Sequence, residues 1–267
     1  MCKIAIITAG DAIDRYIINE LRREFDIKIV IEFYDSQKPQ SRNFTQFFSK
    51  SKIYYLLRSW YLNLYEQRIE SHCQKALNPG AVTSIKSIAA REINSAETAN
   101  RLKELDVDYL LLLGAPVLKE NIFSIPRLGT INLHYGITPK YRGGYTLFWP
   151  FYFNDTRGAG FTLHWVNQGI DTGSVIAQGF PKLSSSAQEK HLTAGCARLA
   201  LTAIKEIFKN RIDRNTKLAS EYRHQPDQFF RYSDRHLKHD ILLFFRRLLR
   251  PSSFERKSDR LEFCFKN

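Results

Sequence analysis

Apolar and polar positions at the start of the chain follow the periods of strands and helices. Residues 3–10 form an alternating apolar run, residues 11–25 repeat apolar positions at helical spacing, and residues 27–34 are largely apolar. A largely apolar run of this length is typical of a buried parallel strand. The order strand, helix, strand predicts a βαβ unit with a right-handed crossover.

The same periods predict further elements along the chain. Asn94 followed by Glu97 has the form of a capping box, which predicts a helix from there to about Leu105. The segment 35–80 is aromatic and basic with a helical pattern, and we interpret it as one or two helices that cover the sheet or form a lid. Plain packing of the aromatic side chains in the core is the interpretation that we favour for them. Other strands are expected at 107–114, 129–134, 159–166 and 173–180, and other helices at 118–125, 145–149 and 186–210. Together these elements predict an α/β fold with a mostly parallel sheet.

Composition limits the class of protein without choosing a partner. The 267 residues are 43% hydrophobic, which is enough for a sizeable core. No apolar run reaches the length of a membrane span, and we do not interpret the N-terminal segment as a secretion signal. The four cysteines have no pair at metal spacing, so we expect reduced thiols in a cytoplasmic protein. The net charge of +13 is compatible with binding to nucleic acid, to anionic membranes or to phosphorylated substrates. It is equally compatible with a solvated basic surface that has no binding role.

Asn132 and His134 place polar groups on an otherwise apolar strand. Side chains alternate across a strand, so both share the face opposite Ile131 and Leu133. Ligands collect beyond the carboxyl ends of parallel strands, where we also expect the loop that holds Asp171. The amide can donate to an oxyanion, and the imidazole can act as acid or base or donate to that oxyanion as an imidazolium. The carboxylate can orient the ring and raise its pKa by favouring the charged form. Each residue also has a simpler interpretation as a turn residue or a satisfied histidine.

Two segments around these residues carry a recognisable order of motifs. They read GTINLHYGITPKYRGG at 129–144 and GFTLHWVNQGIDTGSVI at 160–176. Asn-x-His, a loop like LPxxRG, a strand and an Asp-x-Gly turn, in this order, resemble the folate-dependent formyltransferase family. The likeness is clear from about residue 93 to 180 and weaker over residues 1–34. The chain departs from the family at Ile137-Thr138, where Leu-Leu is frequent, and in the continuation after Gly143.

The resemblance implies a Rossmann-like formyltransferase fold and roles for specific residues. It implies 10-formyltetrahydrofolate as co-substrate, no metal, and Asn132, His134 and Asp171 as the catalytic set. The residues expected to hold the folate, largely through backbone groups, are Leu113, Gly114, Ala115, Pro116, Val117, Gly169 and Ile170. The residues expected at the substrate are Gly10, Tyr135, Arg142 and Gly143.

The resemblance leaves the acceptor amine open. We expect a small molecule, an amino sugar of a sugar nucleotide or a glycan precursor. Methionyl-tRNA is the second candidate and is favoured by the positive charge, although the roughly 50 residues after Thr216 are few for the C-terminal barrel of that class. A formyltetrahydrofolate hydrolase, which usually carries an additional N-terminal domain, is a third candidate function. A non-catalytic binding protein is a fourth.

The chain changes character at about residue 216. We expect a catalytic domain over 1–215 and a short basic extension over 216–267. Within the extension a helical pattern has apolar positions Ile241, Leu242, Phe244, Phe245, Leu248 and Leu249, and basic positions Lys238, Arg246, Arg247 and Arg250. We expect this apolar stripe to pack on the catalytic domain, as most amphipathic helices do. Binding to an anionic membrane and contact with tRNA phosphates are two further interpretations.

Overall fold

The computed structural model describes residues 2–34, 50–216, 227–249 and 254–265. Residues 35–49 of the predicted helical region, and Arg250 of the predicted amphipathic helix, lie outside this part of the chain. The predicted division at 215/216 remains a prediction.

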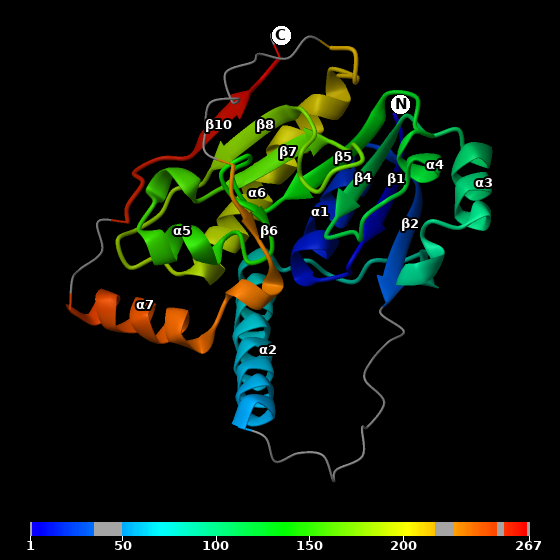
Figure 1. The fold of residues 1–267 in the computed structure, drawn as a ribbon. Helices are drawn as coiled ribbons and strands as arrows, with labels where there is room; N and C mark the ends of the chain where they lie inside the picture. The colour runs from blue at the N-terminus through cyan, green and yellow to red at the C-terminus, as the bar shows by residue number, and fades with distance from the viewer. Residues whose placement is uncertain (1, 35–49, 217–226, 250–253, 266–267) are drawn as a thin grey trace.

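An eight-stranded sheet forms the centre of the molecule (Figure 1), in the order β10-β8-β7-β5-β4-β1-β2-β3. The parallel strands are β1 (Lys3–Thr8), β2 (Asp26–Tyr34), β3 (Ile85–Ala89), β4 (Tyr109–Leu113) and β5 (Gly129–His134). Three antiparallel strands extend the sheet beyond β5, namely β7 (Phe161–Trp165), β8 (Val175–Phe180) and β10 (Arg260–Phe263). The predicted α/β fold with a mostly parallel sheet is confirmed.

Helices cover both faces of the sheet because its central strands are apolar on both. Along β1, Ile4 and Ile6 join the core on one face, and Ala5 and Ile7 join the core on the other. The first core is completed by α1 (Ala12–Arg22) and α6 (Glu189–Lys209), and the second by α3 (Ala96–Glu104) and α4 (Glu120–Phe123). All five residues of β4 are buried, which explains its uninterrupted apolar sequence.

Helix α3 begins one residue later than the capping-box prediction. Ser95 is the N-cap residue, and its hydroxyl accepts a hydrogen bond from the backbone N–H of Thr98. Asn94 instead accepts from the backbone of Lys119 at 2.7 Å and donates to the carbonyl of Val117 at 3.1 Å. The Asn94 side chain therefore supports the loop after β4, and the predicted box with Glu97 is wrong.

Helix α5 (Phe148–Phe153) contains Pro150, whereas the sequence predicted a helix that ended before it. Pro150 is the third residue of the helix, in the first turn, where backbone N–H groups have no partner within the helix. The missing N–H therefore costs nothing there. Short 3-10 helices are formed by Ala90–Glu92 (η2), Thr156–Gly158 (η3) and Tyr232–Asp234 (η5).

Helix α2 (Lys50–Leu77) confirms the helical prediction for residues 50–77. Its C-terminal part packs on α1 and α6, and its N-terminal part extends beyond the sheet (Figure 1). Described residues contain no helix with both the length and the apolar character needed to cross a bilayer.

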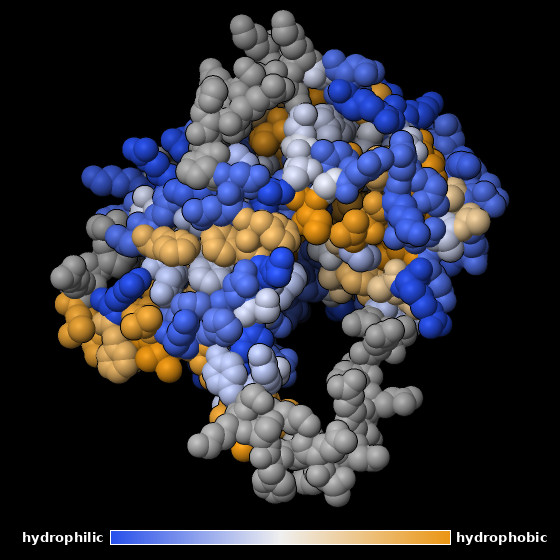
Figure 2. Space-filling model, viewed as in Figure 1, coloured by the Kyte–Doolittle hydropathy of each residue, from blue (hydrophilic) through white to orange (hydrophobic). Residues whose placement is uncertain are grey.

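The C-terminal segment returns to the sheet twice. β9 (Phe229–Phe230) pairs in parallel with β6 (Arg142–Gly143), and β10 pairs with β8. Between them, α7 (Leu237–Leu249) packs beside α5 through a face that includes His239 and Leu243. The expected apolar stripe lies on the other face, so the prediction that it packs on the domain is wrong. Its residues are each 44–77% exposed, and Figure 2 shows them as a hydrophobic area over α7.

Candidate functional site

Strand β5 carries Asn132 and His134 on one face, as its alternation predicts. Ile131 and Leu133 point into the core on the other face. Next to β5, the antiparallel strand β7 places His164 directly opposite Asn132. Asn132 is half-buried, whereas His134 and His164 are buried.

Asp171 reaches this face by a path that the sequence did not indicate. β7 is antiparallel to β5, so the loop after β7 leaves the sheet at the end where β5 begins, not at its carboxyl end. The loop folds back over the face of the sheet, and Asp171 has a positive φ of 51° there. Its Oδ1 accepts a hydrogen bond from Nδ2 of Asn132 at 3.3 Å, and its Oδ2 lies 3.4 Å from Nδ1 of His134. The structure thus brings the three predicted catalytic side chains together.

The two nitrogens of His134 face different partners. Nε2 lies 2.8 Å from the backbone carbonyl of Tyr141, so it carries a hydrogen and donates it. Nδ1 faces the carboxylate of Asp171. Because Nε2 is occupied, Nδ1 is the nitrogen through which His134 can exchange a proton with a bound molecule.

Asp171 is an ionised carboxylate held by several donors. Burial alone would raise its pKa, but the contacts with His164, with His134 and with the backbone N–H of Gly143 lower the pKa of Asp171 to about 2. The carboxylate therefore stays charged throughout the neutral range.

Burial lowers the pKa of His134, although Asp171 and the Tyr141 carbonyl both act to raise it. The predicted effect of Asp171 is present, since its charge acts to raise the pKa of His134, but burial outweighs it and the net shift is downward. The physical reason is that His134 is 7% exposed and loses more hydration than one carboxylate at 3.4 Å restores. Its imidazole is neutral at neutral pH.

His164 is a member of this cluster that the sequence analysis missed. Its Nδ1 lies 2.9 Å from the carbonyl of Trp165, and its Nε2 lies 3.1 Å from Nδ2 of Asn132 and 3.5 Å from Oδ1 of Asp171. His164 therefore fixes the orientation of the Asn132 amide. A signal existed, because the polar residue stands in the apolar segment FTLHW just before the Asp171 loop.

The two loops expected to hold a folate lie near each other. Gln168, beside Gly169 and Ile170, donates to the carboxylate of Glu120, which follows the turn of residues 113–117. Val117 and Ile170 expose 62% and 46% of their side chains, one on each loop. Backbone groups and two exposed apolar side chains fit a flat ring with polar edges.

The turn over residues 113–117 also touches the first loop of the chain. Gly114 has a positive φ of 67°, and a side chain there would lie against Ala9. Gly10, next to Ala9, has a φ of 79°, and a Cβ at this position would collide with the carboxylate of Glu32. Both glycines therefore hold a backbone conformation that favours glycine, at the carboxyl ends of β1 and β4.

Two of the other predicted substrate residues, Arg142 and Gly143, tie the loop of residues 142–144 to the loop that carries Asp171. Arg142 forms two hydrogen bonds to the carboxylate of Asp227, at 2.7 and 2.9 Å, and a third to the carbonyl of Ile170. The N–H of Gly143 donates to Asp171. Tyr135 packs against the core, and its hydroxyl has no hydrogen-bond partner among the described residues. Asp227 was not foreseen, since it lies 85 positions after Arg142.

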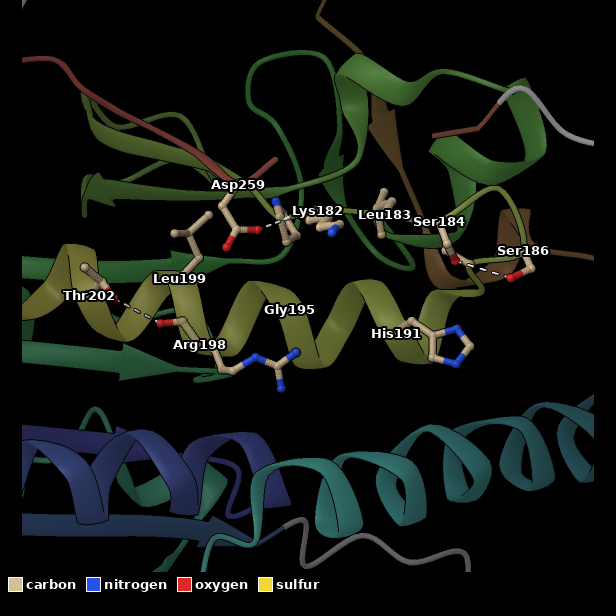
Figure 3. A pocket seen from close by; sticks show the side chains of 12 residues that line it. Lys182, Leu183, Ser184, Ser186, His191, Gly195, Arg198, Leu199, Thr202 and Asp259 are labelled. Carbon is tan, nitrogen blue, oxygen red and sulfur yellow. Dashed lines mark hydrogen bonds between the residues drawn. The ribbon is translucent and has the colours of Figure 1, made fainter. Parts of the chain in front are cut away.

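Cavities also lie away from this cluster. One of about 610 Å³ lies over α6 and the segment before it. Figure 3 shows that its charged side chains do not converge, since Arg198 and Asp259 lie on opposite sides of the α6 ribbon. None of the predicted catalytic residues lines it. Among the described residues, no group of three or more His, Cys, Asp or Glu is arranged to hold a metal ion.

The cluster can perform proton transfer and can stabilise negative charge. Asn132 supplies amide hydrogens, His134 a neutral imidazole, and Asp171 a fixed negative charge beside it. These groups suit acyl transfer to an amine, in which an oxyanion develops and a proton must move.

Comparison with protein families gives a match over the segment that carries these groups. The profile described as "Formyl transferase" matches residues 66–206. A methionyl-tRNA formyltransferase of Nostoc sp. is 41% identical over 81 residues, which are 30% of this chain and 23% of that protein. Its counterpart in Elusimicrobium minutum is 31% identical over 136 residues, 51% of this chain and 37% of that protein. The chain thus aligns with well under half of these relatives.

Solved structures share the fold at low sequence identity. A sugar N-formyltransferase from Shewanella sp. superposes with a TM-score of 0.54 and 12% identity, over 88% of this chain and 78% of that chain. An N-formyltransferase from Helicobacter canadensis, solved with folinic acid and dTDP-3-aminofucose, gives a TM-score of 0.51 and 19% identity, over 89% and 73%.

Proposed function

Because the chain belongs to the formyl transferase family, we propose that it transfers a formyl group from 10-formyltetrahydrofolate to the amine of an amino sugar in a sugar nucleotide or glycan precursor. The observation that carries the proposal is the contact of Asp171 with both Asn132 and His134, at 3.3 and 3.4 Å. The fold shared with sugar N-formyltransferases supports the acceptor class.

The folate would lie between the loops of Val117 and Ile170, with backbone groups of the turn over residues 113–117 toward its polar edges. When bound, it supplies an activated formyl group. Gly10, Tyr135, Arg142 and Gly143 are the proposed contacts on the acceptor side. Holding both substrates in one site removes much of the entropic barrier to their reaction.

Asn132 is the proposed donor to the formyl oxygen as negative charge develops on it. Its two amide hydrogens face His164 and Asp171, and the contact with Asp171, at 3.3 Å, is the longer. We assign the hydrogen facing Asp171 to the oxyanion, because the weaker bond costs less to exchange. One such donor is worth about 2.7–4 kcal/mol of the barrier.

His134 is the proposed proton carrier. The acceptor nitrogen bonds to the formyl carbon and loses a proton, which Nδ1 of neutral His134 accepts. Asp171, ionised because of its low pKa, stabilises the resulting imidazolium. The same proton then passes to the nitrogen of the donor as its bond to the formyl carbon breaks, so the site returns to its first state.

Methionyl-tRNA is the second candidate acceptor. It is favoured by the names of the relatives with 41% and 31% identity and by the net charge of +13. Incubation with 10-formyltetrahydrofolate and a panel of amino-sugar nucleotides and charged tRNA, with product detection by mass, tests both. A formylated sugar supports the first candidate, a formylated aminoacyl-tRNA the second, and hydrolysis of the donor alone contradicts both.

A further inference from the structure

The outer face of α7 is an exposed apolar surface. Six large apolar side chains point away from the protein, each at least 44% exposed. They are Ile241, Leu242, Phe244, Phe245, Leu248 and Leu249. Figure 2 shows them as a continuous hydrophobic area at one end of the molecule. Surface patches of this kind usually mark a site of interaction.

The helix cannot turn this face inward, because its other face is already bound. Arg235, which precedes α7, is fully buried and lies over the rings of Tyr65 and Phe148, at 4.4 and 3.9 Å from their centroids. Its guanidinium binds Asp240 in the first turn of α7 at 2.7 Å. Tyr61 of α2 also donates to Asp240. The inner face is thus fixed by a buried charge network.

The charges on α7 indicate which kind of partner binds its outer face. Lys238, near the start of the helix, is exposed, whereas the guanidinium of Arg246, near its end, donates to the carbonyl of Tyr152 on α5 and lies over the ring of that residue. The helix has one carboxylate, Asp240, and it is paired on the inner face. The outward charge of Lys238 is therefore positive, as is the net charge of +13. A basic helix with Phe and Leu on one face is typical of helices that lie in the plane of an anionic membrane.

A second copy of the chain fits this surface less well. A two-fold contact through the outer face would bring equivalent basic residues of two molecules together, each with a net charge of +13. An anionic bilayer removes the same apolar area from water and neutralises these charges instead.

Helix α2 offers a related surface. Ile53, Leu56, Leu57 and Trp60 repeat at helical spacing near its N-terminal end and are each 47–63% exposed. Figure 1 places this end of α2 and α7 on the same side of the sheet. The hydrogen bond from Tyr61 to Asp240 joins the two helices.

We propose that the outer face of α7, with the N-terminal half of α2 beside it, docks the protein on an anionic phospholipid membrane. The phenylalanine and leucine side chains enter the boundary between headgroups and acyl chains, and Lys238 meets the lipid phosphates. The same segment carries β9, which pairs with β6 next to Asp171, so docking holds the site close to the bilayer.

Co-sedimentation with vesicles tests the proposal without any substrate. The full-length protein should bind vesicles of equal parts phosphatidylglycerol and phosphatidylcholine at low salt, and phosphatidylcholine alone weakly. The double variant Phe245→Gln/Leu248→Gln keeps the charge and the helix but should bind about tenfold less or weaker still. Its circular dichroism and melting temperature should match the wild type, because both side chains are exposed.

A pair of charge reversals separates docking from general attraction. Lys238→Glu should weaken vesicle binding roughly fivefold or more, and Lys103→Glu, which changes net charge equally on the exposed surface of α3, should not. Equal losses in both variants, full binding by the double variant, or no binding by the wild type would overturn the proposal. A dimer in sedimentation velocity that the double variant dissociates, without vesicle binding, would assign the face to a second copy and also overturn it.

Discussion

Nδ1 of His134 lies 3.4 Å from Oδ2 of Asp171, while Nε2 of the same ring is bound to the Tyr141 carbonyl at 2.8 Å. The backbone contact fixes the orientation of the ring, so Nδ1 faces the carboxylate whether or not it carries a proton. A proton that arrives on Nδ1 is stabilised at once. The two residues therefore form one functional unit.

If His134 and Asp171 act as a unit, the losses of kcat caused by substituting each of them should not add. His134→Ala and Asp171→Ala should each lower kcat by about 10²–10⁴, and the double variant by little more than the worse single one. His72→Ala, which removes an imidazole from α2, serves as the control and should leave kcat unchanged. Multiplicative losses in the double variant would show that the residues act separately.

Acid stability should depend on Asp171. Its pKa is lowered in the folded protein from 3.8 to about 2, so it contributes stability above pH ~4 that is lost as the pH falls toward 2. Asp171→Asn should therefore reduce the free energy of unfolding by about 2 kcal/mol at pH 7, and this difference should shrink near pH 3. Urea denaturation at both pH values measures it. A difference in free energy of unfolding that does not change with pH would mean that the substitution destabilises the protein by disturbing packing and not by removing a charge.

His164 should affect kcat by orienting the side chain of Asn132. His164→Phe removes the acceptor at 3.1 Å from Nδ2 of Asn132 and should lower kcat by about 10²-fold or less, with a smaller effect on KM. His164→Gln, whose side-chain oxygen can accept the same hydrogen bond, should recover part of the loss. If both variants lose activity equally while their melting temperatures stay normal, the role of His164 is not positional.

Arg235 should be essential for stability. It is fully buried and binds Asp240 at 2.7 Å, with Glu189 at 3.7 Å. Arg235→Met leaves both carboxylates without their cation and should cost about 3–5 kcal/mol of the free energy of unfolding. The triple variant Arg235→Met/Glu189→Gln/Asp240→Asn should recover much of this loss. Chemical denaturation gives these values, and a neutral outcome for Arg235→Met alone would contradict the assignment.

A folate should stabilise the protein by mass action. At about 100 times its Kd, 5-formyltetrahydrofolate should add about 2.7 kcal/mol to the free energy of unfolding and raise the melting temperature. p-Aminobenzoyl-glutamate, which lacks the pterin ring, should give a much smaller shift. No shift at saturating folate would contradict the assignment of the loops at Val117 and Ile170.

The central parallel strands, including β5 with Asn132 and His134, were predictable, because their apolar residues follow the pattern of a strand in the sequence and are buried in the structure. β3 escaped prediction because its sequence IKSIA is short and partly polar, and parallel pairing with β2 stabilises it. Two-residue strands such as β6 and β9 have no period at all. They form because Gly143 allows close approach to Phe230.

In the site, residue types were predictable and geometry was not. Asn132, His134 and Asp171 meet as expected, but the antiparallel direction of β7 and the return of its loop could not be inferred from spacing. His164 and Asp227 enter through pairing across strands and across 85 positions. The outward face of α7 was misjudged because a helical pattern defines a stripe without showing which neighbour it meets.

The pairing of β6 with β9 also sets an order of events during protein synthesis. Arg142 leaves the ribosome 85 residues before its partner Asp227, an interval of about 4 to 17 seconds at usual elongation rates. In that time β1, β4 and β5 are complete, but the loop beside Asp171 lacks the strand and the carboxylate that hold it. A nascent chain therefore carries every proposed catalytic side chain before it has an ordered site, and competence arrives only when Asp227 and β9 have been made.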